Sequence, residues 1–306
     1  MGMRRLRRVC LTGARAPRLQ GTRVGRGILR GENRGLRAQP RFAVSVCVGV
    51  MATRQRKRAR PSVRWAALIP EEQWDVLVAG VKAAREAGAP VLLGGALALA
   101  TYTGRWRNTK DIDLIVKPGH EADIIARLKA AGFEDYFEKE PYDRSWIFRS
   151  VRDGVILDII WALPNHRVPI DEAWFEHARP VALHGAEYNV VPIEELVRVK
   201  LYVMQRERCD WVDVLNALAG SVDQVDWEHL MARMGRDLPL LQAVLATFAW
   251  LSPDRAIAIP AEVRERFALP TVESDDLAAL EERRVRLFDS RPWWAVHQPE
   301  DQPLER

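Results

Sequence analysis

The stretch "LLGGALALATYTGRWRNTKDIDL", residues 92–114, decides the fold. A short apolar strand ends in Gly94 and Gly95, the next residues favour a helix, and "DIDL" alternates as a strand does. Strand positions i and i+2 point to the same side of a sheet, so Asp111 and Asp113 should project together. Two adjacent carboxylates repel each other unless a cation lies between them, and hard oxygen ligands suit Mg²⁺ or Mn²⁺. The alternative is an exposed strand or turn that is simply acidic.

A third carboxylate interrupts a later apolar strand. Asp158 lies in "VILDIIW", a pattern typical of the centre of a sheet, where a charge is costly unless it is paired or bound to a metal. One interpretation is a strand-end aspartate bonded to backbone amides. The other is a third ligand or a general base in the same cleft as the first pair. Three carboxylates on two strands would meet the requirement of a two-metal phosphoryl-transfer site.

The two glycines and the loop before the acids suggest a phosphate site. Gly94 and Gly95 lack a Cβ atom, so backbone N–H groups can approach a ligand closely, and a helix N-terminus favours phosphate. A plain strand-to-helix turn would use glycines in the same way. Arg107 could hold phosphates as a charged donor or belong to a solvated basic loop. Thr109 could bond a phosphate or cap the turn.

A second segment, "EELVRVKLYVMQRERCDWVDVL", predicts a long helix followed by another helix. Lys200 falls on the apolar stripe of the first helix, where a lysine must extend to solvent or meet an anion, either a triphosphate or a carboxylate of the cleft. Asp210 is suited to be the N-cap of the second helix.

These motifs together resemble the DNA polymerase β-type nucleotidyltransferase superfamily. The resemblance rests on "LLGGALAL", "GRWRNTKDIDL" and "VILDII" in that order, and it covers about residues 91–218. The "R-x-T-x-D-I-D" form is similar to small bacterial members, namely toxin-type nucleotidyltransferases of abortive-infection systems and antibiotic nucleotidyltransferases. The resemblance implies transfer of a nucleoside monophosphate (NMP) from a nucleoside triphosphate (NTP), such as ATP, to an acceptor hydroxyl, with release of pyrophosphate.

The resemblance also implies roles for individual residues. Asp111 and Asp113 would bind the metals, and Asp158 would complete the site and help to deprotonate the acceptor. The glycine pair would hold the triphosphate, although Gly95 stands where many members have serine. Further candidates around the nucleotide are Arg107, Thr109, Lys200 and Asp210.

The resemblance leaves the acceptor and the partners open. A tRNA end, a protein side chain, or a small molecule such as an aminoglycoside or a lincosamide would each offer a hydroxyl. An antitoxin protein is a possible partner by analogy with the toxin-type members. The alternative class is a catalytically inactive nucleotide-binding or regulatory protein with the same fold.

The pattern of elements predicts an α+β (mixed α/β) fold, with a nucleotidyltransferase-type mixed sheet flanked by helices and a C-terminal helical portion. We expect four segments along the chain. They are a basic and disordered leader (1–62), the nucleotidyltransferase core (63–191), a helical portion that closes the cleft (192–252) and a partly loose tail (253–306).

Charge separates the leader from the rest of the chain. The net charge is +5, and the first 60 residues, with 17 Lys and Arg and a single acid, carry +16, so the remainder carries −11. The leader could contact nucleic acid, serve as a targeting segment, or lie upstream of a true start at Met51. Three widely spaced cysteines indicate a reducing compartment, and no apolar run is long enough to span a membrane. We therefore expect a soluble, cytoplasmic protein.

Overall fold

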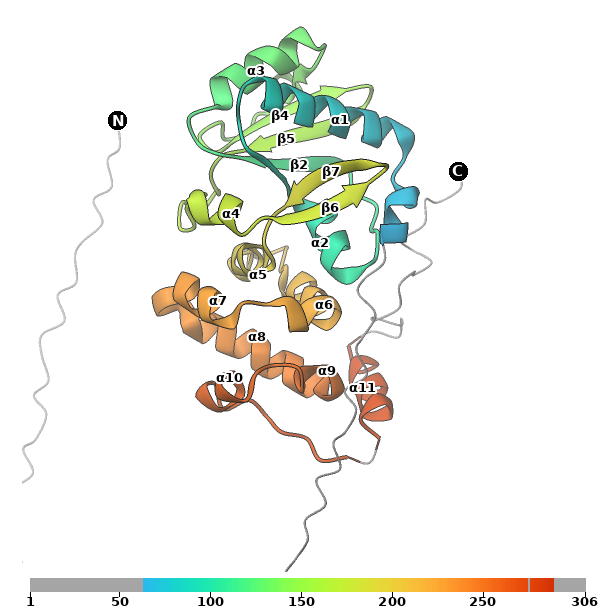
Figure 1. Cartoon of the computed structure of the whole chain (residues 1–306), viewed down its shortest axis with the longest axis vertical. Coiled ribbons are helices and arrows are strands. Elements are labelled where there is room, and N and C mark those ends of the chain that lie inside the picture. The colour runs from blue at the N-terminus through green and yellow to red at the C-terminus, as the bar shows by residue number, and fades with distance from the viewer. Residues whose placement is uncertain (1–62, 275, 289–306) are drawn as a thin grey trace, which may run out of the picture. The chain divides into compact units, whose positions relative to one another are not determined.

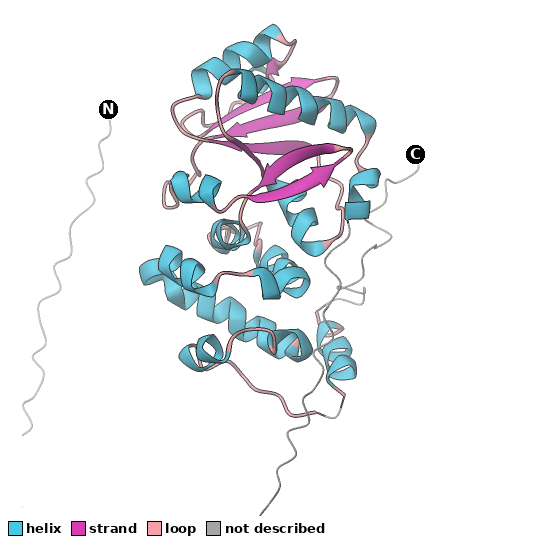
Figure 2. Ribbon diagram, in the orientation of Figure 1, coloured by secondary structure: helices cyan, strands magenta, loops and turns pink. Residues whose placement is uncertain are grey.

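The computed structural model describes residues 63–274 and 276–288. Within this part, helices lie on both faces of a seven-stranded sheet, and further helices follow it (Figure 1). The expected mixed α/β fold with a C-terminal helical portion is confirmed (Figure 2). The prediction for the basic leader lies outside the described residues. No helix in the described ranges is long and apolar enough to cross a membrane.

The sheet is mixed, with the strand order β3-β4-β5-β2-β1-β7-β6. Strand β2 pairs in parallel with β5 and antiparallel with β1, while β1 pairs in parallel with β7. The outer pairs β3–β4, β4–β5 and β6–β7 are antiparallel. The strands are β1 (Val91–Leu93), β2 (Asp111–Val116), β3 (Glu134–Asp135), β4 (Ile147–Arg152), β5 (Val155–Ile160), β6 (Arg179–Leu183) and β7 (Ala186–Val190).

Helices α1 (Glu71–Glu86) and α3 (Glu121–Ala130) cover one face of the sheet, and α2 (Gly95–Thr103) packs on the other (Figure 1). Helix α1 approaches the sheet closely at Gly80, where a Cβ atom would lie 2.9 Å from Leu114 and 2.8 Å from Leu157. Side chains alternate along strands, so the residue next to each of these leucines faces the other side of the sheet, where α2 lies. Asp113 on β2 and Asp158 on β5 are such neighbours, and their side chains therefore point away from α1.

The hairpin of β4 and β5 has a two-residue turn, Asp153 and Gly154. Both turn residues have a positive φ, 54° at Asp153 and 79° at Gly154. Turns of this kind match the right-handed twist of the two strands. Because the turn is so short, it also determines the register, which places Arg149 opposite Asp158.

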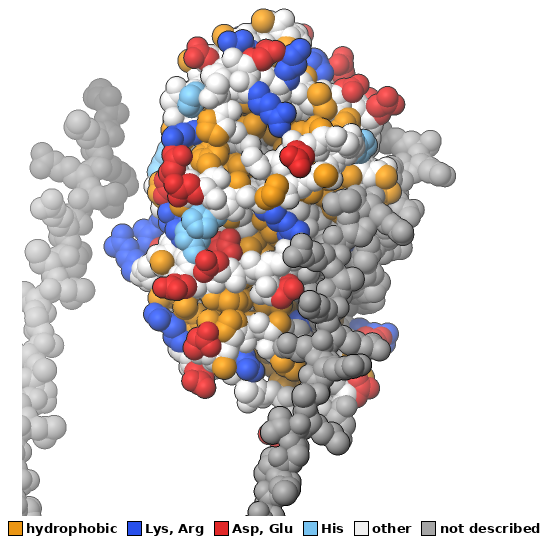
Figure 3. Space-filling view, viewed as in Figure 1, with side chains coloured by type: hydrophobic (Ala, Val, Ile, Leu, Met, Phe, Trp, Pro, Cys, Tyr) orange, Lys and Arg blue, Asp and Glu red, His pale blue; other side chains and the backbone are white. Residues whose placement is uncertain are grey.

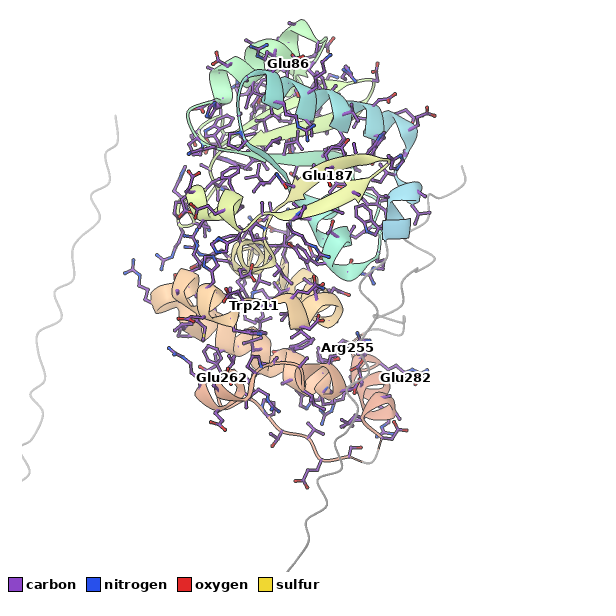
Figure 4. The ribbon with its side chains drawn as sticks, viewed as in Figure 1. Glu86, Glu187, Trp211, Arg255, Glu262 and Glu282 are labelled. Atoms are coloured by element: carbon purple, nitrogen blue, oxygen red, sulfur yellow. The ribbon has the colours of Figure 1, made fainter. Side chains whose placement is uncertain are left out.

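The second half of the described chain is helical, apart from the β6–β7 hairpin. Figure 4 shows side chains filling the space between these helices, and Trp211 at the start of α6 donates from its indole Nε1 to the carbonyl of Leu201 at 3.2 Å. The α-helices are α4 (Glu172–Glu176), α5 (Ile193–Leu201), α6 (Trp211–Ser221), α7 (Trp227–Met234), α8 (Leu238–Leu251), α9 (Pro253–Ala256), α10 (Ala261–Arg266) and α11 (Leu277–Val285). The 3₁₀ helices are η1 (Val63–Leu68), η2 (Tyr136–Glu138), η3 (Val222–Gln224) and η4 (Gly235–Asp237).

The long helix expected after β7 is shorter than predicted. Helix α5 ends at Leu201, and the chain then turns back so that Met204 pairs with Cys209 in an isolated antiparallel bridge. The amide of Asp210 donates to the carbonyl of Val203 at 3.0 Å, which closes this loop. The loop brings the start of α6 back beside the end of α5.

Candidate functional site

Three aspartates converge on one face of the sheet. Asp113 and Asp158 are direct partners in the parallel pairing of β2 with β5, and Asp111 lies two residues before Asp113 on the same face. Burial, followed by the negative charges of Asp111 and Asp158, raises the pKa of Asp113 from 3.8 to about 7. Asp111, Asp113 and Asp158 therefore lie on the same face of the sheet and interact electrostatically.

The N-terminus of α2 lies against this cluster. Gly95 is the first residue of α2 and has a φ of 47°. A Cβ atom at this position would lie 1.7 Å from Oδ2 of Asp113, so only glycine allows the backbone and this carboxylate to come so close. This contact explains why the chain has no serine at Gly95.

Gly94 has a different role from its neighbour. Its N–H donates to the backbone carbonyl of Asp113 at 2.9 Å, so this amide is already used to join β1 to β2. Its carbonyl accepts the hydrogen bond from Ala98, the first bond of α2. Of the predicted glycine pair, Gly95 is the one whose amide lies among the first N–H groups of the helix, which have no intrahelical partner.

Arg149 binds the third carboxylate, and our sequence interpretation missed it. Its Nε and Nη2 donate to the two oxygens of Asp158 at 2.9 Å and 2.6 Å, and Nη2 lies 3.5 Å from Oδ2 of Asp111. Asp158 is 1% exposed. Its burial raises the pKa of this carboxyl, while the arginine lowers it in part. The register of the short hairpin would have identified Arg149 as the partner of Asp158.

Thr109 supports the first aspartate. Its hydroxyl donates to Oδ1 of Asp111 at 2.7 Å, and its backbone carbonyl accepts a hydrogen bond from Gln73 of α1 at 2.9 Å. In this arrangement Thr109 orients Asp111. The same hydroxyl accepts a long hydrogen bond from the backbone N–H of Asp111 at 3.5 Å, in agreement with the turn-capping role considered for Thr109. Its bond to the carboxylate of Asp111 is an additional role that the sequence did not indicate.

Lys200 reaches a second pair of acids, on the loop and helix after α5. Its Nζ lies 2.6 Å from Oδ2 of Asp210 and 2.8 Å from Oδ2 of Asp213. Arg107 binds one member of this pair, through Nη1 to Oδ1 of Asp213 at 3.0 Å. The positive charge of Lys200 also acts to lower the pKa of Asp113, against the larger effects that raise it. Lys200 therefore meets carboxylates, one of the two anions predicted for it, and links α5 and α6 beside the β2 acids.

Asp210 lies at the predicted N-cap position of α6, but its side chain makes no capping hydrogen bond. Instead Arg208 donates to both of its oxygens at 2.7 Å and 2.8 Å, and Lys200 binds it as well. Burial acts to raise the pKa of Asp210, but these hydrogen bonds outweigh it and lower the pKa. The side chain of Asp210 therefore binds Arg208 and Lys200 instead of the backbone amides at the start of α6.

The carboxylate oxygens of this cluster are of the type that binds a divalent cation. Asp111 and Asp113 offer hard oxygen ligands, and their mutual repulsion contributes to the high pKa of Asp113. Among residues 63–274 and 276–288, however, no group of three or more His, Cys, Asp and Glu side chains is arranged to hold a metal ion. Arg149 is the cation that binds both oxygens of Asp158. The arrangement therefore fits a cation held by the two β2 carboxylates.

A mixed sheet that presents paired carboxylates beside a helix N-terminus places the protein in the nucleotidyltransferase superfamily, as the sequence motifs indicated. Residues 63–251 match the family described as "Uncharacterised nucleotidyltransferase", and the chain belongs to that family. No significant match was found among curated proteins.

Several solved structures are similar to this chain at low identity. The antibiotic-resistance factor ANT(2″)-Ia is 19% identical over 65% of this chain and 95% of its own, with a TM-score of 0.35. The lincosamide antibiotic adenylyltransferase LnuA, in its lincomycin-bound form, is 13% identical over 50% of this chain and 99% of its own, with a TM-score of 0.37. JHP933 from Helicobacter pylori is 18% identical over 72% of this chain and 90% of its own, with a TM-score of 0.34.

Proposed function

We propose that the chain is a metal-dependent nucleotidyltransferase that moves NMP from an NTP to an acceptor hydroxyl and releases pyrophosphate. The observation that carries this proposal is the convergence of Asp111, Asp113 and Asp158 on one sheet face, against the first residue of α2. Membership of a nucleotidyltransferase family supports the same reaction class.

The start of α2 would receive the triphosphate. The first N–H groups of a helix have no intrahelical partner and carry partial positive charge, which favours phosphate. Gly95 and Ala96 contribute two of these N–H groups. Because Gly95 lies against Asp113, phosphates bound at this helix end would lie next to the β2 acids.

Asp111 and Asp113 would hold Mg²⁺ or Mn²⁺ through their carboxylate oxygens. Such an ion, when bound, neutralises charge on the phosphates and on the attacking oxygen. Thr109 keeps Asp111 in place through its 2.7 Å hydrogen bond. The packing of Gly95 against Oδ2 restricts the side chain of Asp113.

In the proposed reaction the acceptor oxygen attacks the α-phosphorus in line. A bond forms between these atoms, the bond from the α-phosphorus to the bridging oxygen breaks, and pyrophosphate leaves with the electron pair. The acceptor proton passes to Asp158 once Arg149 turns from this carboxylate toward the negatively charged phosphates. The Nη2 atom of Arg149 already lies 3.5 Å from Oδ2 of Asp111, one of the two acids beside which the phosphates would bind.

The test uses the full chain with each α-³²P-labelled NTP, Mg²⁺ or Mn²⁺, and a cell extract separated into RNA, protein and small molecules. We expect label in one of these fractions, which identifies the acceptor class. Asp113→Asn should reduce transfer by more than about 100-fold, because even outer partners of metal sites cost about 10–100-fold when they are removed. Asp123→Asn, which changes an exposed acid on α3, is the matched control.

One outcome favours the inactive alternative. If NTP binds but no label reaches any fraction, or if Asp113→Asn transfers label as fast as the natural protein, the enzyme proposal is contradicted. The Arg149–Asp158 pair is the observation that gives this alternative its weight, because it occupies the third carboxylate. Arg149→Lys, which keeps the charge but loses the bidentate fork, tests whether the pair limits turnover.

A further inference from the structure

A polar pocket lies on the side of α5 that is opposite Lys200. It has a volume of about 400 Å³ open to water-sized molecules, and all of its lining residues are polar. Ligand pockets commonly measure about 300–1,000 Å³. The lining residues are Asn165, His166, Arg167, Arg198, Tyr202, Arg236 and Asp237.

The helical period separates this pocket from the carboxylate cluster. Arg198 and Tyr202 lie two residues before and two residues after Lys200, and positions two apart on a helix point about 200° away from each other. Lys200 binds Asp210 and the acid at the start of α6, whereas Arg198 and Tyr202 line the pocket. None of the three predicted catalytic aspartates lines it. The pocket is therefore distinct from the site described above.

Positive charge dominates the pocket. Asp237 is its one acid, and this carboxylate is already bound by Arg167 through two nitrogens and by the hydroxyl of Tyr202 at 2.6 Å. Arg236 is exposed, and its positive charge acts on Asp237 in addition to the hydrogen bonds from Tyr202 and Arg167. Figure 3 shows Lys and Arg side chains grouped at the left edge of this face, level with α5. Once Asp237 is neutralised, the remaining charge attracts an anion.

Arg198 gives the pocket a buried and underused donor. It is 9% exposed, and its Nη1 lies 3.3 Å from Oε2 of Glu195, which is fully buried. Its Nε is buried and has no hydrogen-bond partner among the described residues. A guanidinium has five N–H donors, and a charged donor left unpaired in the interior is costly. An anion in the pocket would use the donors that the protein leaves free.

We propose that this pocket binds a phosphate group, either free phosphate or the phosphate of a small phosphomonoester. Guanidinium groups match the oxygens of phosphate with paired, charge-assisted hydrogen bonds. Arg198 and Arg236 supply two such groups, one from α5 and one from η4. The proposal does not rest on nucleotidyl transfer, because it uses none of the carboxylates of that site.

Calorimetric titration of the full chain tests the proposal, with inorganic phosphate in one arm and glycerol 3-phosphate in the other, at constant ionic strength. Arg236→Ala and Arg198→Gln should each weaken phosphate binding by about tenfold or more, because each removes a charge-assisted contact. Arg286→Ala, an exposed arginine of the C-terminal region that pairs with Glu282, is the control and should leave the affinity unchanged.

Two results would overturn the proposal. One is the absence of any phosphate or phosphomonoester binding, and the other is an affinity that survives in both arginine variants. Arg236→Ala replaces an exposed side chain, so it remains informative if Arg198→Gln does not fold. Tighter binding of glycerol 3-phosphate than of inorganic phosphate would identify a phosphorylated small molecule as the ligand, and equal binding would identify free phosphate.

Discussion

Replacing Asp113 by asparagine should make the metal-free protein more stable at alkaline pH. The pKa of this carboxyl is raised from 3.8 to about 7, by burial first and then by Asp111 and Asp158. Between these two pH values the unfolded chain has lost its proton while the folded chain still holds it. The free energy of unfolding therefore falls as pH rises from about 4 to about 7, and the loss is complete above 7.

The size of the effect follows from the same numbers. Each pH step of one in this window costs about 1.4 kcal/mol, so the full difference corresponds to about 4 kcal/mol. Asp113 is partly open to solvent, and water screens its charge, so we expect about half of this value, ~2 kcal/mol. Asparagine cannot ionise, so the advantage of Asp113→Asn over the natural protein should grow by that amount between about pH 4.5 and about pH 8.

Urea unfolding at several pH values, with EDTA present, measures this difference. Asp123→Asn on α3 is the control and should show no such change with pH. Added Mg²⁺ should then stabilise the natural protein at pH 8 by mass action, by about 2.7 kcal/mol at 100 times its dissociation constant, and should stabilise Asp113→Asn far less. A difference between the two proteins that is the same at every pH, or equal stabilisation of both by Mg²⁺, would refute the reasoning.

Three other substitutions test the geometry of the site. Gly95→Ser should abolish transfer activity and lower stability, because a Cβ atom there collides with Asp113. Gly88 also has a positive φ but has open space around it, so Gly88→Ala should cost about 1 kcal/mol of stability and leave activity intact. Transfer assays and thermal unfolding compare the two variants. Lys200→Met should destabilise the fold by about 1.5–3 kcal/mol in urea unfolding, because it removes a charged hydrogen-bond donor shared by Asp210 and Asp213, which keep only Arg208 and Arg107 as partners. Arg149→Met should destabilise it by about 3–5 kcal/mol, and adding Asp158→Asn should recover much of that loss; no recovery in the double variant would show that the pair is not the cause.

The strands, and the face of the sheet on which each aspartate lies, were predictable because they depend on local periodicity, whereas the meeting of the three acids was expected from the family resemblance. Alternation along "DIDL" and "VILDII" sets which side chains share a face, and the parallel pairing of β2 with β5 brings Asp113 beside Asp158. The glycine turn was predictable for a different reason, since few residues other than glycine can end a strand and begin a helix so abruptly. The different roles of Gly94 and Gly95 could not be predicted, because the N–H of Gly94 donates to a carbonyl on the neighbouring strand β2.

The partners of charged side chains were harder to predict. Apolar periodicity continued past Leu201 in the sequence, but α5 ends there, and the closed loop that follows brings Asp210 within 2.6 Å of Lys200. That pairing joins two segments in three dimensions, and no helical pattern encodes it. Arg149 was missed for a different reason, since a basic residue on a strand carries no signal until its opposite partner is identified.

The two-residue turn between β4 and β5 has a consequence for how this chain can vary. Arg149 and Asp158 are partners only because the residues of the hairpin pair in one strict register. One inserted residue at Asp153 or Gly154 would shift that register and turn one strand's side chains to the opposite face. Substitutions that keep a positive φ are tolerable there, but changes of length are not. The length of this turn thus controls whether a buried acid keeps its counterion.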